Sequence, residues 1–354
     1  MLKRVIAIGF LVAAAYCETS PESLAHLRAG ADHLQRGEAS QAVRECKAAL
    51  AADPQSAAAH MLMGRAYLAL RSASVIAEAK AELQQALNLD PDLLWARFYL
   101  ARIYIDLGRT DKAREQLERG LAQRPDIPHF LALLGEVKRK LGDPEASLAL
   151  NRKALEADST LTTASYHLAL AYLDLKKEGD AIRELERSIQ SKYVAPEMYL
   201  ALSSLYTKQR RFREAEDLCK KAIALDESRP DAFLSLAQLH NAQAASDKAL
   251  QAIALALPEG RRFPATAYYQ QLQADIFFEE GRAYQAKRKS PQAIQAYSRS
   301  LDFDPDRGGA HRQLAELFFR TGDRSRAVDH ALAAEKLGSA VDPTLREQIF
   351  RDRR

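Results

Sequence analysis

The sequence reads "QAIQAYSRSLDFDPD" at residues 292–306, where an Ala-rich amphipathic run ends at a short acidic segment and a proline. The same design occurs as "QAVRECKAALAADPQ" at 41–55, "EAKAELQQALNLDPD" at 78–92 and "KAREQLERGLAQRPD" at 112–126. The last two start 34 residues apart, and the first of the three starts 37 residues before the second. A fixed period in this range indicates a solenoid built from one supersecondary unit. The stretch is therefore one copy of a repeat.

The period divides the chain into about nine repeats, each predicted to hold a helix A, a short turn, a helix B and an acidic or proline-bearing link. The repeats are expected to start near Ser23, Ala57, Leu94, Pro128, Thr162, Pro196, Pro230, Ala274 and Gly308. Glycines follow helix A, where a left-handed residue commonly ends a helix. Prolines follow helix B and stop it.

Two small residues and one large residue recur in each repeat, as interlocking helices require. The eighth place is always small, as in Gly64, Gly135 and Gly281. The twentieth place is Ala in eight of the nine repeats, and Ser147 is the exception. The eleventh place is aromatic in six of them. The pattern predicts that helices A and B approach closely at the two small residues.

A run at 277–305, "FFEEGRAYQAKRKSPQAIQAYSRSLDFDP", carries Gly281, Tyr284, Ala293 and Pro305 at these places. With this spacing, residues 23–341 resemble the tetratricopeptide repeat (TPR) family. The resemblance implies an all-α fold, a right-handed superhelical α-solenoid of antiparallel helix pairs. It also implies a concave groove lined mainly by the A helices.

Two segments depart from the repeat. Residues 258–273 form an insertion, which we interpret as a loop followed by two extra turns at the front of the next helix A; the alternatives are a simple loop, a local binding feature or a hinge. Residues 342–354, "DPTLREQIFRDRR", are predicted to form a capping helix and a basic tail. Terminal repeats need such a polar cap to stay soluble.

The N-terminus, residues 1–17, combines Lys3 and Arg4 with an apolar run of 12 residues. That run is shorter than the roughly 17 residues that span a bilayer, and it is typical of a secretory signal peptide. Cleavage is expected after Ala15 or after Cys17, with retention as an anchor as the alternative. Lipidation at Cys17 is disfavoured because Tyr16 precedes it. The sequence therefore predicts an exported protein, periplasmic or secreted in a bacterial setting.

Composition and motifs exclude several classes of function. The net charge of +4 comes from 51 basic and 47 acidic residues without long runs of one sign, which disfavours nucleic acid as a partner. No phosphate-binding loop, dinucleotide fingerprint or zinc-protease motif occurs. Cys46 and Cys219 lie about five repeats apart, too far for a disulfide. We therefore expect neither an enzyme nor a cofactor or metal site.

The candidate partner-binding residues are those expected to face the groove from the A helices. They are Arg65, Trp95, Tyr99, Arg102, Arg139 and Tyr166. Trp, Tyr and Arg dominate the energetics of binding hot spots. The alternative is that some of these side chains fill the seam between adjacent repeats.

The sequence thus predicts an exported scaffold that binds a protein or peptide in its groove, in envelope assembly or as an accessory subunit of a complex. The alternatives are a regulatory subunit of an envelope enzyme and a carbohydrate-binding solenoid.

Overall fold

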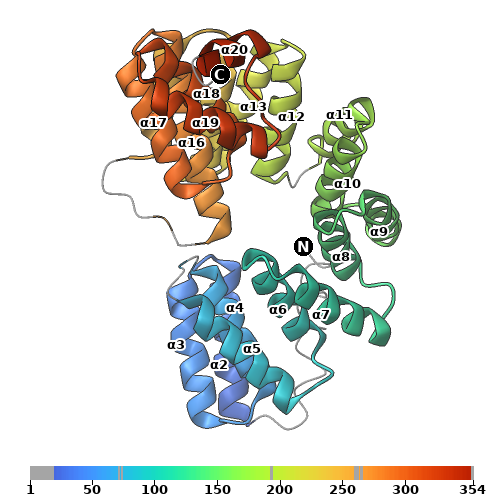
Figure 1. Cartoon of the computed structure of the whole chain (residues 1–354). Helices are drawn as coiled ribbons and strands as arrows, with labels where there is room; N and C mark the ends of the chain where they lie inside the picture. Colours follow the sequence, from blue (N-terminus) through green and yellow to red (C-terminus); the bar gives the residue numbers. More distant parts are fainter. Residues whose placement is uncertain are drawn as a thin grey trace. The chain divides into compact units, whose positions relative to one another are not determined.

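The computed structural model describes residues 20–70, 72, 75–191, 194–258, 263 and 266–351. The proposed signal peptide and Cys17 lie outside this range. The chain divides into two compact units, residues 1–177 and 178–354, which we call the N-terminal and C-terminal units. Across the described residues the secondary structure is helical throughout, without a strand. The all-α solenoid of paired helices is thereby confirmed (Figure 1).

The N-terminal unit holds four helix pairs and one further A helix, and each pair packs A against B. Its helices are α2 (Pro21–Gln35), α3 (Ala39–Ala52), α4 (Ala57–Ala69), α5 (Ile76–Leu89), α6 (Leu94–Asp106), α7 (Thr110–Gln123), α8 (Pro128–Lys140), α9 (Pro144–Ala157) and α10 (Thr162–Asp174). The helices with even numbers are the A helices, and α4, α6, α8 and α10 contact one another in that order. They form one continuous face.

The C-terminal unit begins with a B helix and continues with four pairs and a final short helix. Its helices are α11 (Glu178–Ser188), α12 (Pro196–Lys208), α13 (Phe212–Leu225), α14 (Pro230–Ala242), α15 (Ser246–Ala256), α16 (Ala267–Ala286), α17 (Ser290–Phe303), α18 (Gly308–Arg320), α19 (Arg324–Lys336) and α20 (Pro343–Phe350). Helix α16 begins seven residues before Ala274, and Thr266 caps it by accepting a hydrogen bond from the Tyr269 amide. The insertion therefore contributes two helical turns to an A helix.

The turn after helix A has the same backbone geometry in both units, apart from the turn after α4, which is only partly described. Gly37, Gly108, Gly142 and Gly322 have φ between +70° and +87° there. Where glycine is missing, Lys176, Arg210, Ala244 and Arg288 adopt φ of +57° to +59°. The repeat thus imposes the left-handed turn even on residues for which that conformation is unfavourable.

The predicted small residues lie where helix A meets helix B. A Cβ atom on Gly281 would come within 2.6 Å of the fully buried Tyr297 ring, and one on Gly64 within 2.6 Å of Leu83. Ala79 and Ala293, at the twentieth place, are fully buried. This close approach sets the distance between the helices of each pair.

Candidate functional site

The predicted binding residues all lie on the A helices of the N-terminal unit, whose exposed side we call the N-terminal A face. Arg65 is on α4; Trp95, Tyr99 and Arg102 are on α6; Arg139 is on α8; Tyr166 is on α10. The structure brings the first four together on α4 and α6. It places the last two further along the same row of helices.

Trp95 is partly buried in an aromatic cluster. Its ring centroid lies 5.3 Å from that of Phe98, 6.1 Å from that of Phe130 and 5.6 Å from the imidazole of His129. Phe130 is fully buried and belongs to the next repeat. Trp95 and Phe98 therefore pack at the seam between repeats, and Trp95 also keeps part of its ring exposed. Aromatic residues with one packed side are typical anchors of interfaces.

Tyr99 lies beside Trp95, with 6.3 Å between their ring centroids. Burial raises the pKa of the Tyr99 hydroxyl, and the positive charges of Arg65 and Arg102 oppose that rise. Both guanidinium charges therefore act on the phenol. Arg102 is exposed and Arg65 is partly exposed. The four residues form an aromatic surface bordered by two cations.

Arg139 and Tyr166 have neighbours of a different kind. Arg139 Nη1 donates to Oδ2 of Asp174 at 3.0 Å, an ion pair between α8 and α10. The Tyr166 ring lies 5.6 Å from that of His167. Burial lowers the pKa of His167, and Glu136, whose Oε2 is 3.5 Å from His167 Nε2, opposes the shift. This end of the face is a network of paired charges, so Arg139 is less available to a partner than Arg65 or Arg102.

Sequence reasoning missed His129 and Asp174 as members of this face. His129 contacts both Trp95 and Phe98 by ring contacts. It occupies the second place of helix A, as Trp95 does, so the repeat register could have identified it. Asp174 is the last residue of α10, and only packing shows that it meets Arg139.

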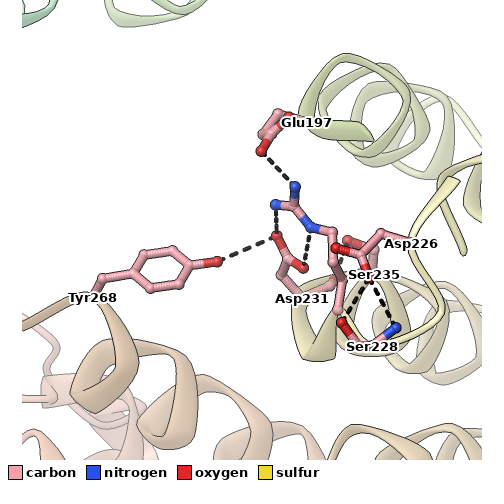
Figure 2. Close-up of polar contacts among 7 residues, drawn as sticks. Glu197, Asp226, Ser228, Asp231, Ser235 and Tyr268 are labelled. Carbon is pink, nitrogen blue, oxygen red and sulfur yellow. Dashed lines mark hydrogen bonds and ion pairs between the residues drawn. The ribbon is translucent and has the colours of Figure 1, made fainter. Parts of the chain in front are cut away.

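A second polar network, also unforeseen, lies in the C-terminal unit (Figure 2). Arg229 donates to both carboxylate oxygens of Asp231, at 3.0 and 2.5 Å, and to Glu197 at 2.5 Å. The Tyr268 hydroxyl, from the helical insertion, donates to Asp231 at 3.2 Å. Arg307 and Asp275 form the equivalent ion pair 78 residues further on than Arg229 and Glu197. The spacing of 32 residues between acid and arginine in both pairs was the available signal.

The other reactive side chains of the described residues, the two thiols, are buried inside the fold. Cys46 and Cys219 are free and buried, and burial raises their thiol pKa values to about 12 and about 11. Across the described part of the chain, no group of three or more His, Cys, Asp or Glu side chains is arranged to hold a metal ion. None of the described helices is both long enough and apolar enough to cross a membrane.

Comparisons with known proteins agree with this architecture. Sequence models of the tetratricopeptide repeat match residues 75–137, 196–229 and 278–341. The human protein O-mannosyl-transferase TMTC3 is 24% identical over 77% of this chain and 34% of its own length. Mouse superkiller complex protein 3 is 34% identical over 44% of this chain and 10% of its own length. The chain thus spans about a third of the first relative and about a tenth of the second.

Solved structures show the same fold. The Cut9–Hcn1 hetero-tetramer of the APC/C aligns with a TM-score of 0.68 at 13% identity, over 84% of this chain and 56% of that one. A tetratricopeptide repeat protein from Parabacteroides merdae aligns with a TM-score of 0.51 at 14% identity, over 85% of this chain and all of that one. Because the repeats, the helix pairing and the family models coincide, the chain belongs to the tetratricopeptide repeat family.

Proposed function

We propose that this protein is an exported scaffold that binds a segment of another protein through the N-terminal A face. The fold is a TPR scaffold, which is suited to protein–protein interaction. The observation that carries the proposal is the surface formed by Trp95 and Tyr99 between Arg65 and Arg102. Export is proposed from the character of residues 1–17, and a role in envelope assembly, or as an accessory subunit of a complex, follows from that location.

The physical basis of binding is preorganisation. The helices already hold Trp95 in contact with Phe98 and Phe130 before a partner arrives. A rigid surface loses little conformational entropy on association, so more of the contact energy remains as affinity. A partner segment that buries the exposed part of the Trp95 ring and meets the two guanidinium groups would use all of this surface.

The test is an affinity capture from an envelope fraction with the full chain as bait. A Trp95→Ala, Arg102→Glu double variant is run beside a Tyr268→Ala, Arg44→Glu double variant. The second removes an exposed aromatic ring and an exposed arginine elsewhere on the chain. Circular dichroism establishes that both variants remain helical.

A partner lost only with the first variant supports the proposal. Direct binding of the purified partner is then measured by fluorescence of Trp95, the only tryptophan in the chain. A partner retained by the first variant, or lost equally with both, shows that binding occurs elsewhere. Capture of a carbohydrate polymer instead of a protein would replace the proposal with a glycan-binding function.

A further inference from the structure

We infer that Arg65, Tyr99 and Arg102 form a carboxylate-binding site, and that the partner segment places an acidic side chain there beside an apolar residue. This inference rests on the proposed function and adds the chemistry of the partner to it. The three residues supply hydrogen-bond donors from two neighbouring repeats, on helices α4 and α6 that contact each other.

The three donors have no internal acceptor. Within the described residues, neither the Arg65 nor the Arg102 guanidinium forms a hydrogen bond or an ion pair, and the Tyr99 hydroxyl has no hydrogen-bond partner. Tyr99 is partly buried among aromatic rings, Arg65 is partly exposed and Arg102 is exposed. Without an acceptor inside the fold, these donors are left to water or to a ligand.

The geometry of the fold brings the donors close together. Arg102 follows Tyr99 by three residues on α6, which places both side chains on one side of the helix. Arg65 lies on α4, which packs against α6. The effect of both guanidinium charges on the Tyr99 pKa agrees with this placement.

The local charge remains positive. The nearest acid on the same helix is Asp106, one turn beyond Arg102. Burial raises the pKa of Asp106, and Arg102 opposes that shift without forming an ion pair with it. Glu136 adds to the rise, and Lys140 opposes it as Arg102 does. Because neither Arg65 nor Arg102 forms an ion pair within the described residues, both charges can act on an anionic ligand.

The other arginines of α6 and α8, in contrast, have partners within the fold. Arg139 pairs with Asp174 at 3.0 Å. Arg97 donates to the Pro91 carbonyl at 2.6 Å and to Gln116 at 3.3 Å. The two arginines beside Tyr99 thus differ from arginines that hold repeats together.

The chemistry of the ligand follows from the donors. Guanidinium groups bind carboxylates with two parallel hydrogen bonds, and a phenol O–H supplies a third donor. The Trp95 ring, with its centroid 6.3 Å from that of Tyr99, offers an apolar surface next to the charged site. An acidic residue adjacent to an aromatic or aliphatic residue matches both parts.

The experiment selects binders to the full chain from a display library of random 12-residue peptides whose C-termini are fused to the coat protein. Parallel selections use Arg65→Gln, Arg102→Gln, Trp95→Ala and, as a matched control, Arg44→Gln. Arg44 is an exposed arginine on α3. The strongest peptide is then synthesised with both ends blocked, as itself and with each acid replaced by its amide, and titrated against Trp95 fluorescence.

We expect the native chain and Arg44→Gln to enrich peptides that hold Asp or Glu next to an apolar residue. Replacing the acid, Arg65 or Arg102 should each weaken binding at least tenfold, and the weakened complexes should lose their salt dependence.

Selection on the native chain that enriches peptides without an acidic residue, to which the Trp95→Ala variant does not bind, would overturn the carboxylate site. The proposed function would then still stand. Acidic peptides that bind both glutamine variants as well as the native chain would also overturn it. Binding only of peptides with a free C-terminus would assign the site to a terminal carboxylate and contradict the side-chain assignment. If no peptide is enriched, both the site and the proposed function are refuted.

Discussion

Arg229, which precedes α14, donates from Nη1 to Oε1 of Glu197 on α12 at 2.5 Å, and this pair joins two successive repeats of the C-terminal unit. Asp231 accepts two further hydrogen bonds from the same guanidinium. The Arg229 side chain is 13% exposed, which limits screening by water. At the equivalent places of the N-terminal unit, Leu93 and Leu161 are buried. At this place, Arg229 of the C-terminal unit forms an ionic contact, whereas Leu93 and Leu161 of the N-terminal unit are apolar.

Arg229→Ala should destabilise the C-terminal unit by about 2 kcal/mol, because Asp231 loses its charged donor while it remains largely covered. Hydrogen exchange by mass spectrometry would show faster exchange in α12 and α14. The double variant Arg229→Ala, Asp231→Ala should recover part of the loss, since no buried charge is then unpaired. An Arg229→Ala protein as stable as the native chain would show that the network is only a surface feature.

Gly281→Ala should destabilise the same unit by about 2 kcal/mol, because overpacking forces buried groups apart. The added Cβ would lie 2.6 Å from the ring of Tyr297, which is fully buried and cannot move away. Urea unfolding followed by circular dichroism measures the change. Gly179→Ala on α11 is the matched control: its Cβ would meet only Arg183 Nη1, at 3.8 Å. That change should stabilise the helix by about 0.5–1 kcal/mol.

Trp95→Ala should cost about 2 kcal/mol, less than a fully buried aromatic residue, because only part of the ring is packed. The lost contacts are those with Phe98, His129 and Phe130. Arg102→Gln, in contrast, should change the free energy of unfolding by no more than about 0.5 kcal/mol, since it replaces an exposed side chain that has no partner within the described residues. Thermal unfolding of both variants separates these cases. An equal loss of stability in the two variants would show that Arg102 has a structural partner.

Acid should weaken the N-terminal unit through His167. Burial holds the pKa of this imidazole below its ordinary value of 6.5, against the opposing effect of Glu136; Arg139 and Lys140 also lower it. The unfolded chain therefore binds the proton more readily, so the His167 contribution is complete above pH 6.5 and declines as the pH falls toward the folded pKa. His167→Gln should make the free energy of unfolding less dependent on pH below 6.5. An unchanged slope would assign the effect to another group.

The two buried thiols should react slowly. Burial raises the pKa of Cys46 to about 12 and that of Cys219 to about 11, so little thiolate forms near neutral pH. In a Cys17→Ser chain, labelling by a thiol reagent should be far slower under native conditions than in urea. Fast native labelling of either thiol would mean that its helix pair opens frequently.

The amino-acid sequence by itself determined the repeat and most of its boundaries. Helices α4, α6, α8, α10, α12, α14 and α18 begin at the residues that the period predicts. The prediction of the helix starts succeeds because each repeat contacts mainly its neighbours. The sequence pattern within a repeat therefore determines how its helices pack. The small residues at Gly64 and Gly281 were identified for the same reason, since a close helix crossing tolerates no larger side chain there.

The tertiary structure decided which surface residues share partners. Arg102 and Arg139 both lie on A helices, yet Arg139 meets Asp174 from the next repeat and Arg102 meets no carboxylate within the described residues. Arg229 and Tyr268 meet at Asp231 only because α16 is extended by two turns. The period sets where a helix lies, whereas the length of a side chain, its rotamer and the charge of the neighbouring repeat set what that side chain contacts. These contacts between repeats are formed by packing, and they distinguish an arginine that holds the fold together from one that is available to a partner.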